Sequence, residues 1–218
     1  QALRRFPDLS RTAILYGGAD GDMFHPPQSR DHEGPPGVLF ASRLVPEKGA
    51  HVLLEAMRLL ERRGIDLTLK VFGASAFGGS AATKYTRDLE HNVPPNVHFC
   101  GYKSGHELAQ EYRAADIFCL PSTYEEPLGM VLVEAIACGL PVVSSRIGGI
   151  PEVISDEVGI LVPPSDPEEL ASALARYAAS KDLRSRTGEA GISLFRKKFT
   201  WDCVREEYLK LLDTVVTS

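Results

Sequence analysis

A glutamate interrupts one of the most apolar segments of the sequence. Glu134 lies within Met130–Cys138, and every other residue of that run is apolar, so a helix over it has no polar face for the side chain. A buried carboxylate is unfavourable unless a cation or hydrogen-bond donors compensate for the lost water. Two partners satisfy this requirement: a cation of the protein, or the vicinal hydroxyls of a ligand such as a ribose, since an ionised carboxylate only accepts hydrogen bonds.

Two basic residues earlier in the chain are suited to a diphosphate. Arg43 and Lys48 stand five positions apart, shortly after an apolar run. Arginine binds phosphate oxygens in a bidentate manner, and lysine acts as a point charge. Taken by themselves the two are better explained as surface cations, and it is their position at the end of a predicted strand that favours binding.

The loop before the apolar run adds acids and a glycine. In YEEPLG (124–129), Glu126 stands eight positions before Glu134, and Gly129 precedes the expected helix. A helix that begins near Gly129 directs its free N–H groups and the positive end of its dipole toward the loop, which favours phosphate binding there. A diphosphate alone would be repelled by the two glutamates. Cations and helix amides for phosphate, together with acids for hydroxyls, therefore indicate a nucleotide sugar.

These residues fall at the ends of short apolar runs that alternate with amphipathic segments. The near-continuous hydrophobicity of the runs is typical of strands in a parallel sheet covered on both faces. Helices are expected between them, one with its apolar face at 53–60 and others at about 81–91, 105–115, 129–138 and 167–179, and the chain is all helical from Lys181. The runs are GVLFAS (37–42), LTLKVFG (67–73), VHFCG (97–101), DIFCLPS (116–122), PVVSS (141–145) and GILVP (159–163).

This alternation predicts an α/β fold: a doubly wound, Rossmann-like parallel sheet of about six strands with helices on both faces. Ligands bind such a sheet at the carboxyl ends of its strands. Asp166 is expected to cap the helix that starts at Pro167, with Glu169 completing a capping box, and Thr200 to cap the last helix. The loops expected to meet at the binding edge are 43–49, 73–80, 101–105, 123–129 and 146–152.

The composition argues against several other classes of function. A formal net charge of −5 does not favour a nucleic-acid partner. The 4 cysteines form no C-x-x-C pair and the 6 histidines are isolated, so neither a disulfide framework nor a metal site is expected. No apolar run approaches the roughly 20 residues of a membrane span. We expect a cytoplasmic protein, with at most a peripheral membrane contact at Arg196–Lys198, and, because the chain starts at Gln1, a piece of a longer one.

Longer segments resemble one enzyme family. YEEPLGMVLVEAIACGLPVVSSRIGGIPEVI (124–154) is similar to the segment with two glutamates separated by seven residues in the retaining family-four glycosyltransferases, which have the two-domain GT-B architecture. YGGADGDMFHP (16–26) resembles the family's N-G-V-D-x-x-x-F-x-P segment, with Gly17 in place of asparagine and Ala19 in place of valine. FASRLVPEKG (40–49), VHFCGYKSGHELAQEYRAADIFCLPS (97–122) and FTWDCVREEYLKLL (199–212) resemble the family's diphosphate loop, base pocket and closing helix.

The resemblance implies a role for each candidate residue. Glu134 would bind the ribose hydroxyls, and Glu126, which has the family's spacing where Glu125 does not, would contact the transferred sugar as a catalytic residue. Arg43 and Lys48 would bind the diphosphate, and the backbone of Gly129, Met130 and Val131 would contact the diphosphate and the sugar. The backbone at Tyr102 would face the base, and Gly73 would begin a loop over the donor cleft.

The resemblance also implies a domain organisation and a reaction. Residues 1–36 would be a segment and linker from a missing N-terminal acceptor domain, 37–199 the nucleotide-sugar donor domain, which is the C-terminal half of a GT-B fold, and 200–218 a closing helix that docks toward the missing domain. A hexosyl group would pass, with retention and without metal or cofactor, from a UDP-, GDP- or ADP-sugar to a glycan, lipid or small-molecule acceptor. The isolated chain is expected to be inactive.

Other functions leave weaker signals. GASAFGGS (73–80) matches a phosphate-binding G-x-x-x-x-G-K-S loop except that Gly79 replaces the lysine, which argues against an NTPase. No G-x-G-x-x-G follows the first strand, which argues against a nicotinamide dehydrogenase. Two alternatives to a transferase use the same site: a nucleotide-sugar binding or regulatory module, and a GT-B nucleotide-sugar epimerase. An acceptor domain would distinguish a transferase from the first, and analysis of the products from the second.

Overall fold

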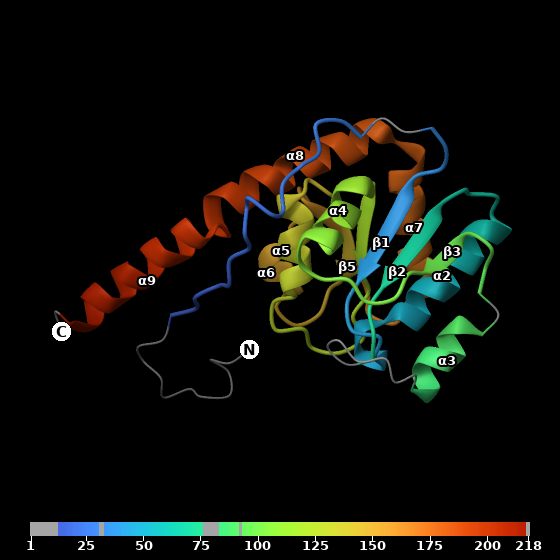
Figure 1. The fold of residues 1–218 in the computed structure, drawn as a ribbon, viewed down its shortest axis with the longest axis horizontal. Helices are drawn as coiled ribbons and strands as arrows, with labels where there is room; N and C mark the ends of the chain where they lie inside the picture. The colour runs from blue at the N-terminus through green and yellow to red at the C-terminus, as the bar shows by residue number, and fades with distance from the viewer. Residues whose placement is uncertain (1–12, 31–32, 76–82, 92, 217–218) are drawn as a thin grey trace.

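Six parallel strands form one sheet in the order β3-β2-β1-β4-β5-β6 (Figure 1). The computed structural model describes residues 13–30, 33–75, 83–91 and 93–216. Each strand lies inside one of the predicted apolar runs, which confirms the doubly wound parallel sheet. The strands are β1 (Gly37–Ala41), β2 (Thr68–Phe72), β3 (Val97–Phe99), β4 (Ile117–Leu120), β5 (Val142–Ser145) and β6 (Gly159–Val162).

The centre of the sheet is fully enclosed. Val38 of β1 pairs with Leu69 of β2 on one side and with Ile117 of β4 on the other. All four side chains of β4 have 0% exposure, as expected for a strand covered on both faces. The strand order reverses direction between β1 and β4, so the loops after these two strands diverge and leave a crevice at the carboxyl-end edge.

Helices cover both faces of the sheet (Figure 1). Helix α2 packs against α7 on one face, while α4 and α5 contact the central strands on the other, where α8 packs against α5. The helical elements are a 3-10 turn (Pro46–Lys48), α2 (Ala50–Arg62), α3 (Lys84–Glu90), α4 (Gly105–Ala114), α5 (Met130–Ala137), α6 (Ile150–Val153), α7 (Pro167–Ala179), α8 (Lys181–Lys198) and α9 (Trp201–Val216).

Local capping chemistry sets where several helices begin. The Asp166 carboxylate accepts a hydrogen bond from the Glu169 amide at 3.0 Å, and the Thr200 hydroxyl accepts one from the Cys203 amide at 3.2 Å. Both predicted caps are therefore confirmed. Helix α6 was not predicted, because its four residues include Pro151 and are too short to show an apolar period.

The N-terminal segment (residues 13–25) returns to the junction of α8 and α9. The Ala19 amide donates to the Phe199 carbonyl at 2.9 Å, and Ala19 forms a parallel bridge with Thr200. Nearby, the Tyr16 hydroxyl donates to Glu152 Oε2 at 2.9 Å. The segment and the start of α9 thus leave the sheet side by side (Figure 1).

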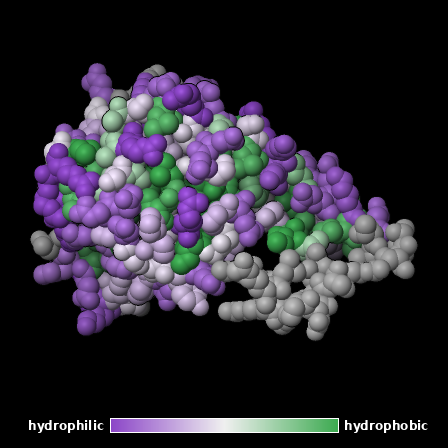
Figure 2. Space-filling model, turned by 180° about the vertical axis from the view of Figure 1, so that it is seen from behind, coloured by the Kyte–Doolittle hydropathy of each residue, from purple (hydrophilic) through white to green (hydrophobic). Residues whose placement is uncertain are grey.

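Helix α9 projects away from the sheet and carries exposed apolar side chains. We call Trp201, Tyr208, Leu209 and Leu212 the α9 apolar face; they are 58%, 50%, 51% and 41% exposed. Figure 2 shows hydrophobic side chains on the projecting part of the molecule. These four side chains are accessible to solvent in this chain.

Candidate functional site

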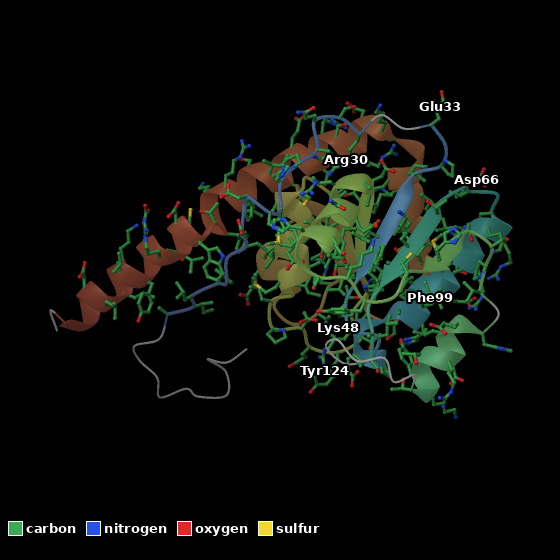
Figure 3. The ribbon with its side chains drawn as sticks, viewed as in Figure 1. Arg30, Glu33, Lys48, Asp66, Phe99 and Tyr124 are labelled. Atoms are coloured by element: carbon green, nitrogen blue, oxygen red, sulfur yellow. The ribbon has the colours of Figure 1, made fainter. Side chains whose placement is uncertain are left out.

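A cavity of about 490 Å³ opens at the carboxyl-end edge of the sheet, between the loops that follow β1 and β4. Figure 3 places Lys48 at this edge and Arg30 at the opposite edge. Every candidate site residue from the sequence lines this one cavity: Arg43, Lys48, Gly73, Tyr102, Glu126, Gly129, Met130, Val131 and Glu134. Of the predicted loop 73–80, residues 76–80 lie outside the described part of the chain.

Lys48 and Glu126 form an ion pair within the cavity wall. Their side chains are only 15% and 11% exposed, and the Ser122 hydroxyl donates to the same Glu126 Oε2 at 3.4 Å. Arg43 is exposed and has no hydrogen-bond or ion-pair partner among the described residues. The cavity therefore holds one cation that a carboxylate already neutralises and one that is available to an anion.

Glycine is required where the loop after β1 approaches the loop after β4. Gly49 has φ 74°, and a Cβ there would stand 1.8 Å from the Pro121 carbonyl oxygen. Its amide closes the turn by donating a hydrogen bond to the Pro46 carbonyl at 3.0 Å. This close approach brings Lys48 opposite Glu126, and a larger residue at position 49 would separate the two loops.

Two adjacent glycines, Gly148 and Gly149, pack against the backbone at Glu126. The Gly149 amide donates to the Glu126 carbonyl at 2.7 Å. A Cβ on Gly148 would stand 2.3 Å from that oxygen, and one on Gly149 would stand 1.9 Å from the Pro127 carbonyl oxygen. The loop 146–152 was expected at the binding edge, but no role was predicted for these glycines. Two adjacent glycines shortly after a buried strand were the available signal.

The first turn of α5 borders the cavity. Gly129 precedes it with φ 75°, a left-handed conformation that glycine adopts without strain. The amides of Met130 and Val131 belong to this turn, where helix N–H groups have no acceptor within the helix. At the other end of α5, Arg30 donates to the carbonyls of Cys138 and Gly139, which places a cation at the negative end of the helix dipole.

Met130 contacts the N-terminal segment at Gly17. A Cβ on Gly17 would stand 2.9 Å from the Met130 sulfur, which is the far end of a flexible side chain that is 37% exposed. The resembling family has asparagine at this position, and nothing in the structure explains the glycine.

Glu134 finds its partner in a tyrosine rather than in a cation. The Tyr112 hydroxyl donates to Glu134 Oε2 at 2.9 Å, and no ion pair involves Glu134 within the described residues. Burial raises the pKa of the Glu134 carboxyl and the hydrogen bond from Tyr112 offsets part of that rise, which leaves the pKa at about 7. The side chain is partly rather than fully buried, and it faces the cavity. Of the two partners expected from the sequence, a protein cation is thus not used.

The far end of the cavity carries a further cation that sequence reasoning did not identify. Lys103 Nζ lies 2.7 Å from Glu111 Oε1 and 5.1 Å from the centroid of the Phe72 ring. Tyr102 beside it is 47% exposed. Gly73 lies between these residues and β1, and a Cβ there would stand 1.9 Å from the Ser42 carbonyl oxygen. This end of the cavity thus combines an aromatic side chain with a lysine.

The described residues contain no group of three or more histidines, cysteines, aspartates and glutamates arranged to hold a metal ion. All four cysteines are unpaired, and burial raises the pKa of the Cys138 thiol to about 12. Within the same described ranges, no helix has the length and apolar character needed to cross a membrane.

Comparisons with known proteins agree with this geometry. The sequence model of the family "Glycosyl transferases group 1" matches residues 23–194. The D-inositol 3-phosphate glycosyltransferase of Saccharomonospora viridis is 35% identical over 209 residues, which cover 89% of this chain and 48% of that protein. Spore coat protein SA of Bacillus subtilis is 28% identical, over 96% of this chain and 60% of that protein. The chain therefore spans about half the length of these relatives.

Solved structures share the fold. Sucrose-phosphate synthase from Thermosynechococcus elongatus superposes with a TM-score of 0.83 at 29% identity, over 99% of this chain and 55% of that one. The C-terminal domain of LpcC, a group 1 glycosyltransferase from Francisella tularensis, gives 0.72 at 25% identity, over 84% of this chain and 100% of that one. Anabaena Alr3699/HepE in complex with UDP and glucose gives 0.78 at 24% identity, over 92% and 56%. The chain belongs to the group 1 glycosyltransferases and has the fold of the C-terminal half of a GT-B enzyme.

Proposed function

We propose that this chain is the donor-binding half of a retaining glycosyltransferase that transfers a hexosyl group from a nucleoside diphosphate sugar to an acceptor. One observation carries the proposal: a single cavity at the reversal point of the sheet collects free and paired cations, the start of a helix, and a partly buried carboxylate without a cation. Phosphates, a reacting sugar and a ribose diol each find complementary groups there.

The diphosphate is proposed to lie between Arg43, Lys48 and the first turn of α5. When the bond between the anomeric carbon and the diphosphate oxygen breaks, its electron pair stays on the diphosphate, and fixed positive groups stabilise that charge. Lys48 is held by Glu126 before a donor arrives. A bound diphosphate would share this cation, so Glu126 would lie beside both the leaving group and the departing sugar.

Glu126 is proposed to contact the transferred sugar. Its backbone is fixed by Gly149 and its side chain by Lys48 and Ser122, so the carboxylate has a defined direction in the cavity. A negative charge there favours the positive charge that develops on the sugar ring as the bond breaks. The same position is open to a covalent role as nucleophile, and trapping with an unreactive sugar analogue tests that role.

Glu134 is proposed to bind the ribose. Glu134 lines the cavity; its Oε2 accepts a hydrogen bond from the Tyr112 hydroxyl, and its Oε1 has no hydrogen-bond partner among the described residues. A ribose diol brings two O–H donors, which suit an ionised carboxylate. The cost of burying this acid in the free protein would then be offset when the donor binds.

The acceptor is proposed to bind to a second domain outside this chain. The chain covers about half of its relatives' length, and the side chains of the α9 apolar face are 41–58% exposed. We propose that this face docks on the N-terminal half. In the isolated chain, limited proteolysis should then cut within residues 200–218 first, and protection of that stretch would show that α9 is stable without the partner.

Calorimetry with UDP, GDP, ADP and their sugar conjugates tests the donor site. UDP and UDP-glucose are the first probes, because HepE structures contain them. Binding should be lost in Glu134→Ala and in the double variant Arg43→Ala/Lys48→Ala. Glu125→Ala removes an exposed neighbouring acid, and it should bind as the unmodified chain does.

A thermal-shift measurement gives an independent check. A ligand at a hundredfold over its dissociation constant stabilises the folded state by about 2.7 kcal/mol. The control for the double cation variant is Arg196→Ala/Lys198→Ala, which removes equal charge at the end of α8, away from the cavity. Equal loss of binding in both double variants would mean that net charge, rather than the cavity, attracts the nucleotide. No binding of any nucleotide by the chain or by the longer protein would refute the proposal.

A further inference from the structure

Tyr112 connects four parts of the molecule beneath the cavity. It lies in α4 and has 0% exposure. Its ring stacks on Phe118 of β4 at 5.4 Å and meets Phe24 of the N-terminal segment edge-on at 5.6 Å. Its hydroxyl reaches α5, where it contacts Glu134 Oε2 at 2.9 Å and the Val131 carbonyl at 3.3 Å. Ring packing thus fixes where the hydroxyl lies, and that position is against the candidate ribose-binding acid.

The two contacts of the hydroxyl suit the two charge states of Glu134. A phenol has one proton to donate and can also accept a hydrogen bond. When Glu134 is ionised, the proton points to the carboxylate. When Glu134 is protonated, the acid can donate to the phenol oxygen, while the phenol turns its own proton to the Val131 carbonyl. Tyr112 therefore supports the ionised acid by donating to it, which a phenylalanine of the same shape cannot do.

Few other groups face Glu134. Cys138 follows one turn later in α5, and both Arg30 and Arg113 lie near that thiol. Arg113 donates to the Met23 carbonyl at 2.9 Å, and Arg30 is engaged at the end of α5. Arg43, Lys48, Lys103 and Glu126 line the same cavity, but none of them forms an ion pair with Glu134. Among the described residues Tyr112 is thus the one hydrogen-bond donor to this carboxylate.

We propose that Tyr112 is a positioning residue for donor binding: its hydroxyl orients the Glu134 carboxylate so that Oε1 remains free for the ribose diol. This inference rests on the proposed role of Glu134 in binding the donor. Tyr112 itself does not touch the donor, because it is fully buried and does not line the cavity. Its effect on affinity would therefore be indirect, through the Glu134 carboxylate that it orients.

The first test needs no ligand. The Glu134 carboxyl carbon is followed by NMR from pH 4 to pH 9 in the unmodified chain, in Tyr112→Phe and in Tyr177→Phe. Tyr177 is also a fully buried tyrosine but lies in α7. A hydrogen bond to a charged group corresponds to a shift of about one to two pH units. The midpoint should rise by that amount in Tyr112→Phe only, and an unchanged midpoint would overturn the proposal.

A second variant gives the opposite sign and keeps the ring. 3-Fluorotyrosine placed at position 112 is a stronger hydrogen-bond donor than tyrosine, so it should lower the Glu134 midpoint. If Tyr112 had only a structural role, every change at this position would shift the Glu134 midpoint in the same direction. A rise of the midpoint with fluorotyrosine would therefore contradict the proposal, even if Tyr112→Phe folded poorly.

Binding measurements then separate this inference from the proposed function. At pH 7.5, Tyr112→Phe should bind UDP about ten-fold more weakly, because most of its Glu134 is protonated; the deficit should shrink by pH 9. 2′,3′-Dideoxy-UDP, which lacks the diol, should bind equally to both proteins. If Glu134→Ala loses UDP and Tyr112→Phe does not, the positioning role is wrong and the donor site stands. If Glu134→Ala keeps UDP affinity, the proposed role of Glu134 fails, and the binding role of Tyr112 fails with it.

Discussion

Replacement of Glu134 by glutamine should stabilise the free protein while it weakens donor binding. Burial raises the pKa of this carboxyl from its ordinary value of 4.5 to about 7. Between these two pH values the folded protein holds a proton that the unfolded chain has released, so the stability of the unmodified protein falls as the pH rises through this window. Each pH unit is worth about 1.4 kcal/mol, and the full cost above pH 7 is therefore about 3 kcal/mol.

The glutamine side chain has the same shape and no charge, and it can still accept a hydrogen bond from Tyr112. The gain in the free energy of unfolding should be near zero at pH 4.5 and should grow to about 3 kcal/mol at pH 8. Urea unfolding at several pH values measures it. Glu125→Gln, which removes an exposed acid beside the cavity, is the control for the loss of one charge. A gain in the free energy of unfolding that does not depend on pH would show that the ionised Glu134 carboxylate does not destabilise the folded protein.

Three further changes test the framework around the site. Gly49→Ala should destabilise the fold by about 3 kcal/mol or more, because its backbone is left-handed and the new Cβ would meet the Pro121 carbonyl. Gly64 also has a left-handed backbone, with φ 68°, but a Cβ there would have no atom within 4 Å, so Gly64→Ala should cost about 1–2 kcal/mol. Equal losses of stability in the two variants would contradict the close approach of Gly49 to Pro121. Asp166→Ala should lower the free energy of unfolding by about 1 kcal/mol through the lost cap, as a thermal melt will show. Trp201→Ser should change the stability of this chain by less than about 0.5 kcal/mol, and a larger loss in urea unfolding would place Trp201 in its core.

The sequence predicts the strands and most helices because their signals are local. Each buried strand is a run of apolar residues, and caps such as Asp166 act on an amide three residues away. Helix α6 was missed because four residues do not show a period. The collection of the site residues at one edge followed from topology, since all parallel strands end on the same side.

The partners within the site were not predictable in the same way. Lys48 meets Glu126 across 78 positions, and Tyr112 reaches Glu134 across 22. A sequence shows that a buried acid needs a partner, but the choice between a cation, a phenol and a ligand depends on packing between helices. The role of Gly149 was hidden for the same reason, because its contact with Glu126 exists only after β4 and β5 lie side by side.

The pairing of Ala19 with Thr200 has a mechanical consequence. The hydrogen bond from the Ala19 amide to the Phe199 carbonyl restrains the N-terminal segment and the start of α9 from sliding past each other at this point. A displacement of α9 would therefore be passed to residues 16–19. The rings of Tyr16 and Phe199, whose centroids lie 5.9 Å apart, pack at the same junction.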